Sequence, residues 1–390
     1  MRLLIDSVMM RSPGGIQLRN ELVRSVEERA PEDCNVVLLV SSGSCRLVDS
    51  DKLRVVAVDP PKGYWVGKWN WYNNILPKLA KNHGANVLYS LSGIVSKKLC
   101  ESFGVVNTAN NMMPFTPEIL RTYPLFSKSQ LRYTLLRHTL ITSIKMADAV
   151  VLHSQHALNM ITPYTGDISS KSFVVLTGVP RDMKFDRSAM PPHPYDGVSY
   201  FLYLSAIYSY KNHLGLIEAY RQALSEKNTL PDLLIAGLPA DKEYLKKILA
   251  TIREIGLENK VKYIGVLDRE DIPAWIYYAD VNFFPSICET NSIVLAEILG
   301  LGGVLACSSI SSMPEVVSYA AEFFDPYSID SMKHAIIKLC HNRKRCEELR
   351  CLALKRATEL SWNVCGATIW QAVMKAQAAF LDRKERLKCF

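Results

Sequence analysis

The sequence lacks the marks of several large protein classes. Its ten cysteines form no Cys-x-x-Cys pair, and no Cys/His group has the spacing of a zinc site. We therefore expect buried free thiols, a reducing compartment and no bound metal. The longest apolar run, Ile293 to Cys307, contains Glu297 and is too short to span a bilayer. Asp6 interrupts the early apolar stretch, so no signal peptide is expected. These absences predict a cytoplasmic protein.

Repeats and low-complexity segments are also missing. The 390 residues are 48% hydrophobic and 22% charged, which is typical of a globular protein with two or three domains. The net charge of +8 favours anionic partners such as nucleotide phosphates or lipid headgroups. Because the basic residues are dispersed and form no nucleic-acid motif, no nucleic-acid partner is expected. The oligomeric state is left open.

Short apolar runs alternate with helical patterns along the whole chain. Nearly continuous apolar runs indicate strands buried on both faces of a parallel sheet. We predict strands at 3–9, 36–41, 55–58, 87–91, 105–108, 149–153, 173–176, 200–205, 233–236, 261–264, 281–284, 304–306 and 322–324. Helices are predicted at 16–29, 71–82, 129–145, 214–226, 242–255, 293–301 and 331–354. This alternation predicts an α/β fold.

A proline-rich stretch divides these elements into two groups. Pro191, Pro192 and Pro194 lie in a segment without hydrophobic periodicity, which is typical of a linker. We predict a first domain at 1–185, a linker at 186–198, a second domain at 199–370 and a returning helix at 371–390. The predicted fold is two doubly wound parallel-sheet, Rossmann-like domains that face each other across a cleft, as suits a site for two substrates.

Two loops could bind an anion. Gly14 and Gly15 follow the first strand and open the first helix, where glycine permits close backbone approach and free N–H groups attract anions. A plain tight turn explains them equally well, and the pattern is not that of a nicotinamide site. Lys211 follows the strand at 200–205 and precedes a helix, so its cation could neutralise a diphosphate. An ordinary solvated lysine is the alternative.

The segment from Phe284 to Gly303 carries the strongest pattern. A strand ends near Pro285, a loop contains Glu289, and Ser292 is suited to cap the next helix. Glu297 interrupts the apolar stripe of that helix, and a buried carboxylate needs a hydrogen-bonding or charged partner. The hydroxyls of a nucleotide ribose are suitable partners, whereas a solvent-facing position is the alternative.

Two further segments have open interpretations. Residues 62–73 concentrate aromatic side chains, including Tyr64, Trp65, Trp69 and Trp71, which either stack on sugar rings or pack on the sheet. Residues 121–145 mix basic side chains with Tyr123, Phe126 and other apolar ones. That helix either lies on an anionic membrane or is an ordinary amphipathic surface helix.

The ordered series of motifs resembles the retaining glycosyltransferases of the GT-B fold, family 4. The similarity covers residues from about 147 to 370. It rests on a Glu-x7-Glu signature at Glu289 and Glu297 and on shorter matches around it. The shorter matches include Asp148, Gly178-Val179, Gly237, Tyr263-Ile264-Gly265, Ala279-Asp280, Pro314-Glu315-Val316, Phe324-Asp325-Pro326 and Ser361-Trp362.

The resemblance implies a role for each matching residue. Glu297 would hold the ribose of a nucleotide-sugar donor, Glu289 would lie under the donor sugar, and Lys211 would bind the diphosphate. Backbone N–H groups of Thr290, Asn291 and Ser292 would contact phosphate or sugar, and Gly14 and Gly15 would contact the leaving phosphate or the acceptor. The sequence departs from the family at Ala206, where an arginine is usual, so diphosphate binding would depend more on Lys211 and on backbone dipoles. It also departs at 107–114, where the family often has a catalytic histidine. Asn110 or Asn111 would take that place, with Asn111 as the catalytic candidate, and would donate hydrogen bonds without moving protons.

The implied activity is transfer of a sugar with retention, without a metal or other cofactor. The donor would be a UDP- or GDP-hexose and the acceptor a glycan or lipid-linked sugar, with peripheral membrane contact as a further expectation. A nucleotide-sugar epimerase of the same fold and a non-catalytic carbohydrate- or nucleotide-binding protein remain alternatives. A sugar transferase acting on nucleic acid ranks below them.

Overall fold

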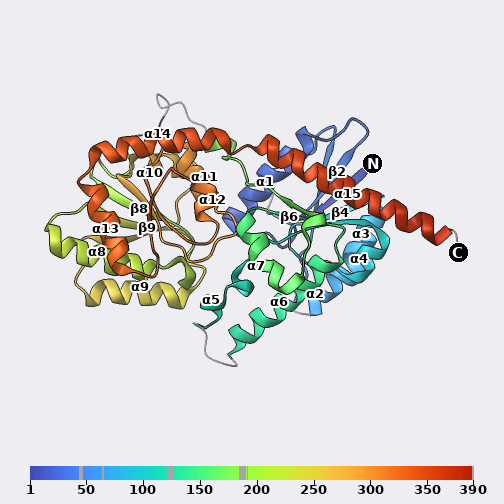
Figure 1. Ribbon diagram of the computed structural model, residues 1–390, viewed down its shortest axis with the longest axis horizontal. Helices are drawn as coiled ribbons and strands as arrows, with labels where there is room; N and C mark the ends of the chain where they lie inside the picture. The colour runs from blue at the N-terminus through green and yellow to red at the C-terminus, as the bar shows by residue number, and fades with distance from the viewer. Residues whose placement is uncertain (44–46, 64–65, 122–126, 184–189, 191, 389–390) are drawn as a thin grey trace. The chain divides into compact units, whose positions relative to one another are not determined.

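The chain divides into two units, and the first is made of two separate stretches of sequence. The computed structural model describes residues 1–43, 47–63, 66–121, 127–183, 190 and 192–388 (Figure 1). The first unit comprises Met1–Thr177 together with Ser361–Phe390, and the second comprises Gly178–Leu360. The second unit is therefore an insertion between two parts of the first.

Each unit is built on one parallel sheet. The first sheet has the order β3-β2-β1-β4-β5-β6-β7, and the second has the order β10-β9-β8-β11-β12-β13. The strands of the first are β1 (Arg2–Asp6), β2 (Asn35–Ser41), β3 (Leu53–Val58), β4 (Val87–Ser90), β5 (Gly104–Thr108), β6 (Ala149–Leu152) and β7 (Ser172–Val174). Those of the second are β8 (Tyr200–Leu204), β9 (Asp232–Ala236), β10 (Val261–Gly265), β11 (Val281–Phe284), β12 (Leu305–Ser308) and β13 (Glu322–Phe324).

The central strands are buried on both faces, as their continuous apolar runs predict. Every residue of β4, β5, β6, β8, β11 and β12 is buried. Each predicted run overlaps a strand of the structure, and all the pairings are parallel. The predicted architecture of two Rossmann-like parallel-sheet units is confirmed.

Helices connect the strands of each sheet (Figure 1). In the first unit they are α1 (Pro13–Glu28), α2 (Val66–Asn70), the π-helix η1 (Trp71–Ile75), α3 (Leu76–Asn82), α4 (Lys97–Ser102), η2 (Met113–Phe115), α5 (Pro117–Arg121), α6 (Lys128–Met146), α7 (Gln155–Thr165), η3 (Ser169–Lys171) and α15 (Trp362–Lys388). In the second unit they are η4 (Arg181–Met183), η6 (Ser209–Lys211), α8 (His213–Lys227), α9 (Lys242–Glu254), α10 (Ile272–Tyr278), α11 (Ile293–Gly300), α12 (Met313–Val317), α13 (Ile329–Cys340) and α14 (Arg343–Glu359).

One predicted helix is two helices in the structure. The sequence predicts a single helix over 331–354, but α13 ends at Cys340 and α14 begins at Arg343. The break lies at Asn342, whose side-chain oxygen accepts a hydrogen bond from the backbone N–H of Arg345 at 2.9 Å. An asparagine in this role starts a new helix, because it satisfies a backbone donor that has no partner inside the helix.

The unit boundaries also differ from the predicted ones at 185 and 371. The chain passes from the first unit to the second at 177/178 and returns at 360/361. Within the predicted linker, residues 186–189 and 191 lie outside the described residues. The remainder packs on the second unit, where the Tyr195 hydroxyl donates to Asp232 at 3.1 Å and the His193 ring contacts Tyr200. These aromatic contacts and the hydrogen bond attach the proline-rich segment to the second unit.

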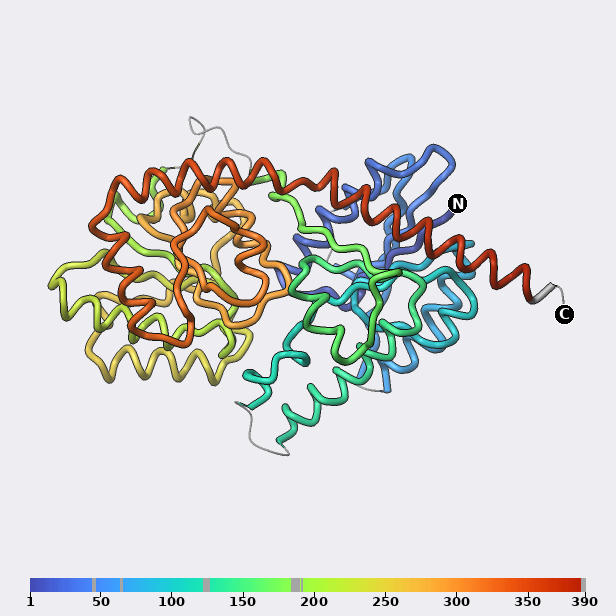
Figure 2. The backbone as a smooth tube through the Cα atoms, viewed as in Figure 1, coloured from blue at the N-terminus to red at the C-terminus, as the bar shows by residue number. Residues whose placement is uncertain are grey.

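The last helix, α15, belongs to the first unit. It packs on α1 and on β4 to β7, and the tube in Figure 2 follows this red segment beside the blue α1. The Trp370 indole donates to the carbonyl of Val26 at 2.7 Å. Gly366 lies so close to α1 that a Cβ there would be 2.4 Å from the Ser25 carbonyl oxygen.

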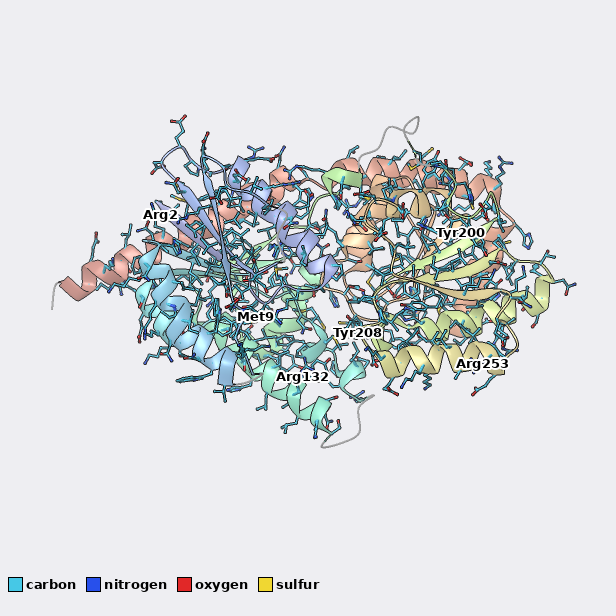
Figure 3. The ribbon with its side chains drawn as sticks, turned by 180° about the vertical axis from the view of Figure 1, so that it is seen from behind. Arg2, Met9, Arg132, Tyr200, Tyr208 and Arg253 are labelled. Atoms are coloured by element: carbon cyan, nitrogen blue, oxygen red, sulfur yellow. The ribbon has the colours of Figure 1, made fainter. Side chains whose placement is uncertain are left out.

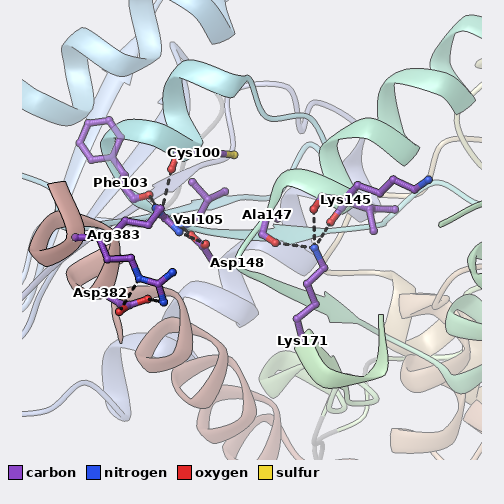
Figure 4. A network of polar contacts seen from close by, with 11 residues as sticks. Cys100, Phe103, Val105, Lys145, Ala147, Asp148, Lys171, Asp382 and Arg383 are labelled. Carbon is purple, nitrogen blue, oxygen red and sulfur yellow. Dashed lines mark hydrogen bonds and ion pairs between the residues drawn. The ribbon is translucent and has the colours of Figure 1, made fainter. Parts of the chain in front are cut away.

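A polar network fixes the far end of α15 (Figure 4). The Arg383 guanidinium pairs with Asp148 and donates to the carbonyls of Cys100 and Phe103, each at 3.0 Å. Asp148 also accepts from the backbone N–H of Val105 at 2.8 Å. One arginine thus ties α15 to α4 and to the starts of β5 and β6.

Candidate active site

The second unit has a topological switch point between β8 and β11. These two strands are neighbours, although the chain runs outward from β8 through β9 and β10 and then returns to β11. In sheets of this kind, ligands bind beyond the carboxyl ends of the strands at the switch point. Lys211 follows β8, and Glu289 follows β11. The fold therefore brings two of the predicted site residues to the same edge of the sheet.

Local hydrogen bonds hold Lys211 in place. The Tyr203 hydroxyl, from β8, donates to the carbonyl of Lys211 at 2.6 Å. Asn212 adopts a left-handed conformation (φ 58°) that asparagine tolerates well, and its side chain donates to the carbonyl of Pro326 at 2.8 Å. The Lys211 ammonium lies 5.4 Å from the ring centroids of both Tyr210 and Phe284. This loop is closely tied to its surroundings.

Lys211 and Glu289 form an ion pair. The Lys211 Nζ donates to Glu289 Oε1, and the two side chains are only 12% and 11% exposed. Both backbone groups of Glu289 are bound: its N–H donates to the Ser311 hydroxyl at 3.0 Å, and its carbonyl accepts from Ser311 and Ser312. The pair is therefore a fixed charge arrangement at low exposure, where electrostatic interactions are stronger than in water.

Glu297 lies in α11 and pairs with an arginine. Its side chain is 2% exposed, and its Oε1 accepts from Arg269 Nη1. Arg269 also binds Asp182 with two parallel hydrogen bonds, from Nε and Nη2, each at 2.9 Å. The predicted burial of Glu297 is present, and its partner in the structure is this guanidinium.

Burial dominates the ionisation of Glu297. The pKa of Glu297 is raised from 4.5 to about 7, because removal from water raises it more than the positive charge and hydrogen bond of Arg269 lower it, and the negative charge of Asp182 raises it further. The carboxyl group consequently titrates near neutral pH. Buried groups with shifted pKa values beside a specific charged partner are candidates for a functional site.

The segment between Glu289 and α11 supplies backbone groups. Thr290 and Asn291 are half-buried, and Ser292 is the buried residue that precedes the first turn of α11. The Ser292 side chain makes no capping hydrogen bond to the helix. These three residues lie in the same unit as Lys211, Glu289 and Glu297.

The glycine pair lies in the first unit, at the start of α1. Gly14 is exposed, whereas Gly15 is half-buried and donates its N–H to the Ser12 hydroxyl at 3.2 Å. A Cβ on Gly15 would lie 2.8 Å from that hydroxyl oxygen. The close contact with the capping Ser12 therefore explains a glycine at position 15 without a bound ligand.

Asn111 is also in the first unit and is exposed after β5. Its Oδ1 accepts from the N–H of Met113 at 3.1 Å, at the start of η2. The neighbouring Asn110 has a different partner, since its Nδ2 donates to the carbonyl of Leu91 at 3.2 Å. Of the two candidates, Asn111 has the exposed side chain.

The aromatic segment divides between core and surface. Trp71 is 1% exposed, and its indole donates to the buried Asp6 at 3.3 Å. Tyr72 is 3% exposed and donates to Ser92 at 2.8 Å, whereas Trp69 is 63% exposed. Tyr64 and Trp65 lie outside the described residues. The packing interpretation thus holds for Trp71 and Tyr72 and does not describe Trp69.

Two residues of the site had no signal in the sequence. Arg269 lies in Asp268-Arg269-Glu270-Asp271, a charged string that resembles any exposed loop, and Asp182 lies near the end of the predicted first domain. Neither has a diagnostic spacing to Glu297. Within the described ranges, no cluster of His, Cys, Asp or Glu is arranged to hold a metal ion.

Two Rossmann-like units, with Lys211 and Glu289 meeting at the switch point of the second, have the fold of the GT-B glycosyltransferases. The family model described as glycosyl transferases group 1 matches residues 189–356, which cover most of the second unit and contain Lys211, Glu289 and Glu297. The match thus coincides with the candidate site.

Two relatives that match part of the chain are named mannosyltransferases. An O-antigen chain mannosyltransferase B of Escherichia coli is 28% identical over 168 residues, 43% of this chain and 43% of that protein. A serotype-specific mannosyltransferase WbdA of the same organism is 23% identical over 235 residues, 57% of this chain and 28% of that protein. The chain thus spans less than half the length of these relatives.

Solved structures match nearly the whole chain in fold. A sucrose-phosphate synthase from Thermosynechococcus elongatus has a TM-score of 0.76 at 15% identity, covering 97% of this chain and 100% of that one. HepE from Anabaena, solved in complex with UDP and glucose, has a TM-score of 0.69 at 16% identity, covering 96% and 99%. At such low identity these likenesses establish the architecture.

Proposed function

We propose that the protein is a retaining glycosyltransferase that moves a hexose from a nucleotide-diphosphate donor to a hydroxyl group of a glycan or lipid-linked sugar. The observation that carries the proposal is the Lys211–Glu289 ion pair at the switch point of the second sheet. It lies within the segment that matches the glycosyltransferase family model.

The proposed chemistry follows from the charges of these residues. Negative charge grows on the diphosphate as the sugar departs, so a fixed cation at Lys211 stabilises the transition state more than the ground state. A bound diphosphate would draw the Lys211 ammonium from Glu289, leaving the carboxylate to accept hydrogen bonds from the sugar. The departing phosphate is the proposed base for the acceptor hydroxyl. Glu297 is assigned to the ribose, and Thr290 to Ser292 to phosphate or sugar.

The first unit is proposed to bind the acceptor. Gly14 and Gly15 keep their proposed role toward the leaving phosphate or the acceptor, and Asn111 keeps its proposed role as a hydrogen-bond donor in place of a histidine. The relatives named mannosyltransferases make a mannosyl donor the first candidate, and the complex of HepE with UDP makes a uridine donor the second. No metal or other cofactor is proposed.

Three variants test the donor site. Calorimetry measures the binding of GDP and UDP, and steady-state kinetics measure the transfer of the sugar. Glu297→Gln removes a charged acceptor worth about 1.5–3 kcal/mol, so nucleotide affinity should fall about tenfold to a hundredfold. Lys211→Ala should lower turnover by about two orders of magnitude with a smaller effect on affinity. Glu289→Gln should spare affinity for the bare nucleotide and impair transfer.

Arg221→Gln is the matched control. Arg221 forms an exposed ion pair with Glu218 on α8, so its loss should leave binding and turnover unchanged. Unchanged turnover in all three site variants would rule out this active site. Release of free nucleotide should require an acceptor, whereas an epimerase would turn over the donor alone. Tight binding without turnover across GDP- and UDP-hexoses would favour a non-catalytic binding protein.

We further propose that the first unit rests on an anionic membrane surface through α2 and α6. Among the described residues, no helix combines the length and hydropathy needed to cross a bilayer. Val66 and Trp69 on α2 and Leu131 and Leu135 on α6 are 45–80% exposed. Arg132 (labelled in Figure 3) is close enough to Lys68 that, after burial, its charge is the main cause lowering the pKa of Lys68. The two helices therefore share one basic, apolar surface.

The charge of this surface supports an anionic partner. Residues 60–100 contain six lysines and no acidic residue, and residues 119–147 contain five lysines and arginines and no acidic residue. Exposed tryptophan and leucine beside such charges suit the interface of a lipid bilayer. Tyr123 and Phe126 lie outside the described residues.

Sedimentation with lipid vesicles tests the proposal. The protein should bind vesicles that contain phosphatidylglycerol and release them in high salt, and it should not bind neutral phosphatidylcholine vesicles. Trp69→Ser combined with Leu131→Ser should reduce binding by about tenfold. Val364→Ser, which alters an exposed apolar residue on α15, is the control. Equal binding to both kinds of vesicle would contradict an electrostatic surface.

A further inference from the structure

Arg269 joins three separate elements of the second unit. It lies in the loop before α10, and its guanidinium stands between Asp182 on η4 and Glu297 on α11. The pair with Asp182 uses two parallel hydrogen bonds of 2.9 Å, and Nη1 is left for Glu297. A planar guanidinium bound in this way has little freedom to rotate, so Asp182 fixes the direction from which Arg269 meets Glu297.

The three side chains are graded in exposure. Asp182 is 46% exposed, Arg269 is 22% exposed and Glu297 is 2% exposed. The innermost carboxylate therefore depends on Arg269 for its countercharge, while the outer carboxylate remains partly solvated. An ionised carboxylate removed from water without a countercharge is costly and tends to take up a proton instead.

Protonation would change what Glu297 can bind. A carboxylate accepts hydrogen bonds at both oxygens, whereas a carboxylic acid must donate at one of them. The two hydroxyls of a ribose can each donate, so they match the ionised form. Arg269 and Asp182 are the charged groups that act on Glu297, the first favouring the carboxylate and the second opposing it.

We propose that Arg269 is a positioning residue of the donor site, which favours the ionised form of Glu297 and orients it by binding Oε1 so that Oε2 meets the nucleotide ribose. The proposal rests on the proposed function, because it assigns Glu297 to the ribose. It extends that function by making the arginine, held by Asp182, part of nucleotide recognition.

The first measurement needs no ligand. The carboxyl carbon of Glu297 is followed by NMR as a function of pH, and its resonance is identified by its loss in Glu297→Gln. Arg269→Gln removes the positive charge that lowers the pKa of Glu297, so the midpoint should rise above that of the wild type by about one pH unit or more. Arg269→Lys keeps the charge and should bring the midpoint back toward the wild-type value.

The second measurement is the affinity for GDP and UDP by calorimetry from about pH 6 to about pH 9. Wild-type affinity should fall as the pH drops through about 7, where Glu297 takes up a proton. Arg269→Gln should bind about tenfold more weakly at neutral pH and should recover part of that loss at the alkaline end. Arg269→Lys should restore the pH profile.

Asp182→Asn separates the orientation of Arg269 from its effect on the ionisation of Glu297. It loosens the hold on Arg269, and removing a nearby negative charge lowers the pKa of Glu297. Affinity should therefore fall without an upward shift of the pH profile. This variant and Arg269→Lys keep the test decisive if Arg269→Gln does not fold. Arg221→Gln, which breaks an exposed pair on α8, should match the wild type in both measurements.

The outcomes distinguish the inference from the function on which it rests. If Arg269→Gln binds nucleotide as tightly as the wild type, or more tightly, Arg269 is not a positioning residue. If the Glu297 midpoint does not move in that variant, the ionisation argument fails as well. If Glu297→Gln binds nucleotide normally while the NMR midpoint still follows Arg269, the assignment of Glu297 to the ribose fails and the Arg269–Glu297 coupling stands.

Discussion

Asp6 is a fully buried carboxylate at the carboxyl end of β1. It is 0% exposed, and it accepts hydrogen bonds from the Trp71 indole and from the N–H of Val8, both at 3.3 Å. Two hydrogen bonds compensate only part of the lost hydration. Burial therefore raises the pKa of Asp6 from 3.8 to about 6, although both hydrogen bonds lower it.

This shift makes the stability of the first unit depend on pH. The folded state holds the Asp6 proton more tightly than the unfolded state, so the contribution of this group is complete below about pH 4 and is lost as the pH rises through about 6. Asp6→Asn keeps an acceptor oxygen and removes the charge. The free energy of unfolding of Asp6→Asn minus that of the wild type should increase by up to about 3 kcal/mol as the pH is raised from about 4 to about 7.

Unfolding in urea, monitored by circular dichroism at several pH values, measures the difference in free energy of unfolding between Asp6→Asn and the wild type. Val364→Ala, at an exposed position on α15, is the control, because it changes no titratable group and its difference from the wild type should not change with pH. A constant difference for Asp6→Asn would mean that Asp6 is not held with a raised pKa.

At the scale of elements, α1 and α15 pack closely together at a glycine of α15. Gly366 permits the approach, since a Cβ there would lie 2.4 Å from the carbonyl oxygen of Ser25 and 2.8 Å from its carbonyl carbon. Both atoms are backbone and cannot rotate away. The two helices would have to separate to admit even one methyl group.

Gly366→Ala should therefore destabilise the protein by about 1–3 kcal/mol, even though alanine favours helices over glycine by about 1 kcal/mol. Thermal unfolding gives the change in midpoint. Val364→Ala, at a 58% exposed position on the same helix, should change the midpoint little. A more stable Gly366→Ala protein would show that propensity outweighs the crossing.

The strands were predictable from the sequence because both faces of each sheet are covered. That covering demands unbroken apolar runs such as Tyr200–Leu204, and these are visible without any structure. The break between α13 and α14 was less visible, because Asn342 acts through a single capping hydrogen bond. No proline or glycine marks the break, so the sequence reads as one helix across it.

Those residues of the candidate site that follow a strand could be predicted from the sequence. Lys211 and Glu289 each follow a strand, and the switch point brings them together. Arg269 reaches Glu297 across an intervening stretch of chain, and Asp182 reaches Arg269 across a longer one. Pairs of that kind depend on how loops fold over the sheet, which composition and spacing do not report.

At the scale of the whole molecule, the first unit is made of two pieces of chain. Met1–Thr177 supply the sheet and most of its helices, and Ser361–Phe390 supply α15. The second unit, Gly178–Leu360, is continuous. Trp370 and Phe380 are buried in the first unit and come from its second piece. The core of the first unit is therefore incomplete without the end of the chain.

This arrangement has a consequence for biosynthesis. Domains usually fold in the order in which they leave the ribosome, the N-terminal one first, at about 5–20 residues per second. Here the ribosome completes the second unit before it synthesises α15. Until then, the surface of the first unit that Trp370 covers remains exposed. Loss of the segment after Leu360 would therefore damage the half of the protein whose synthesis began first.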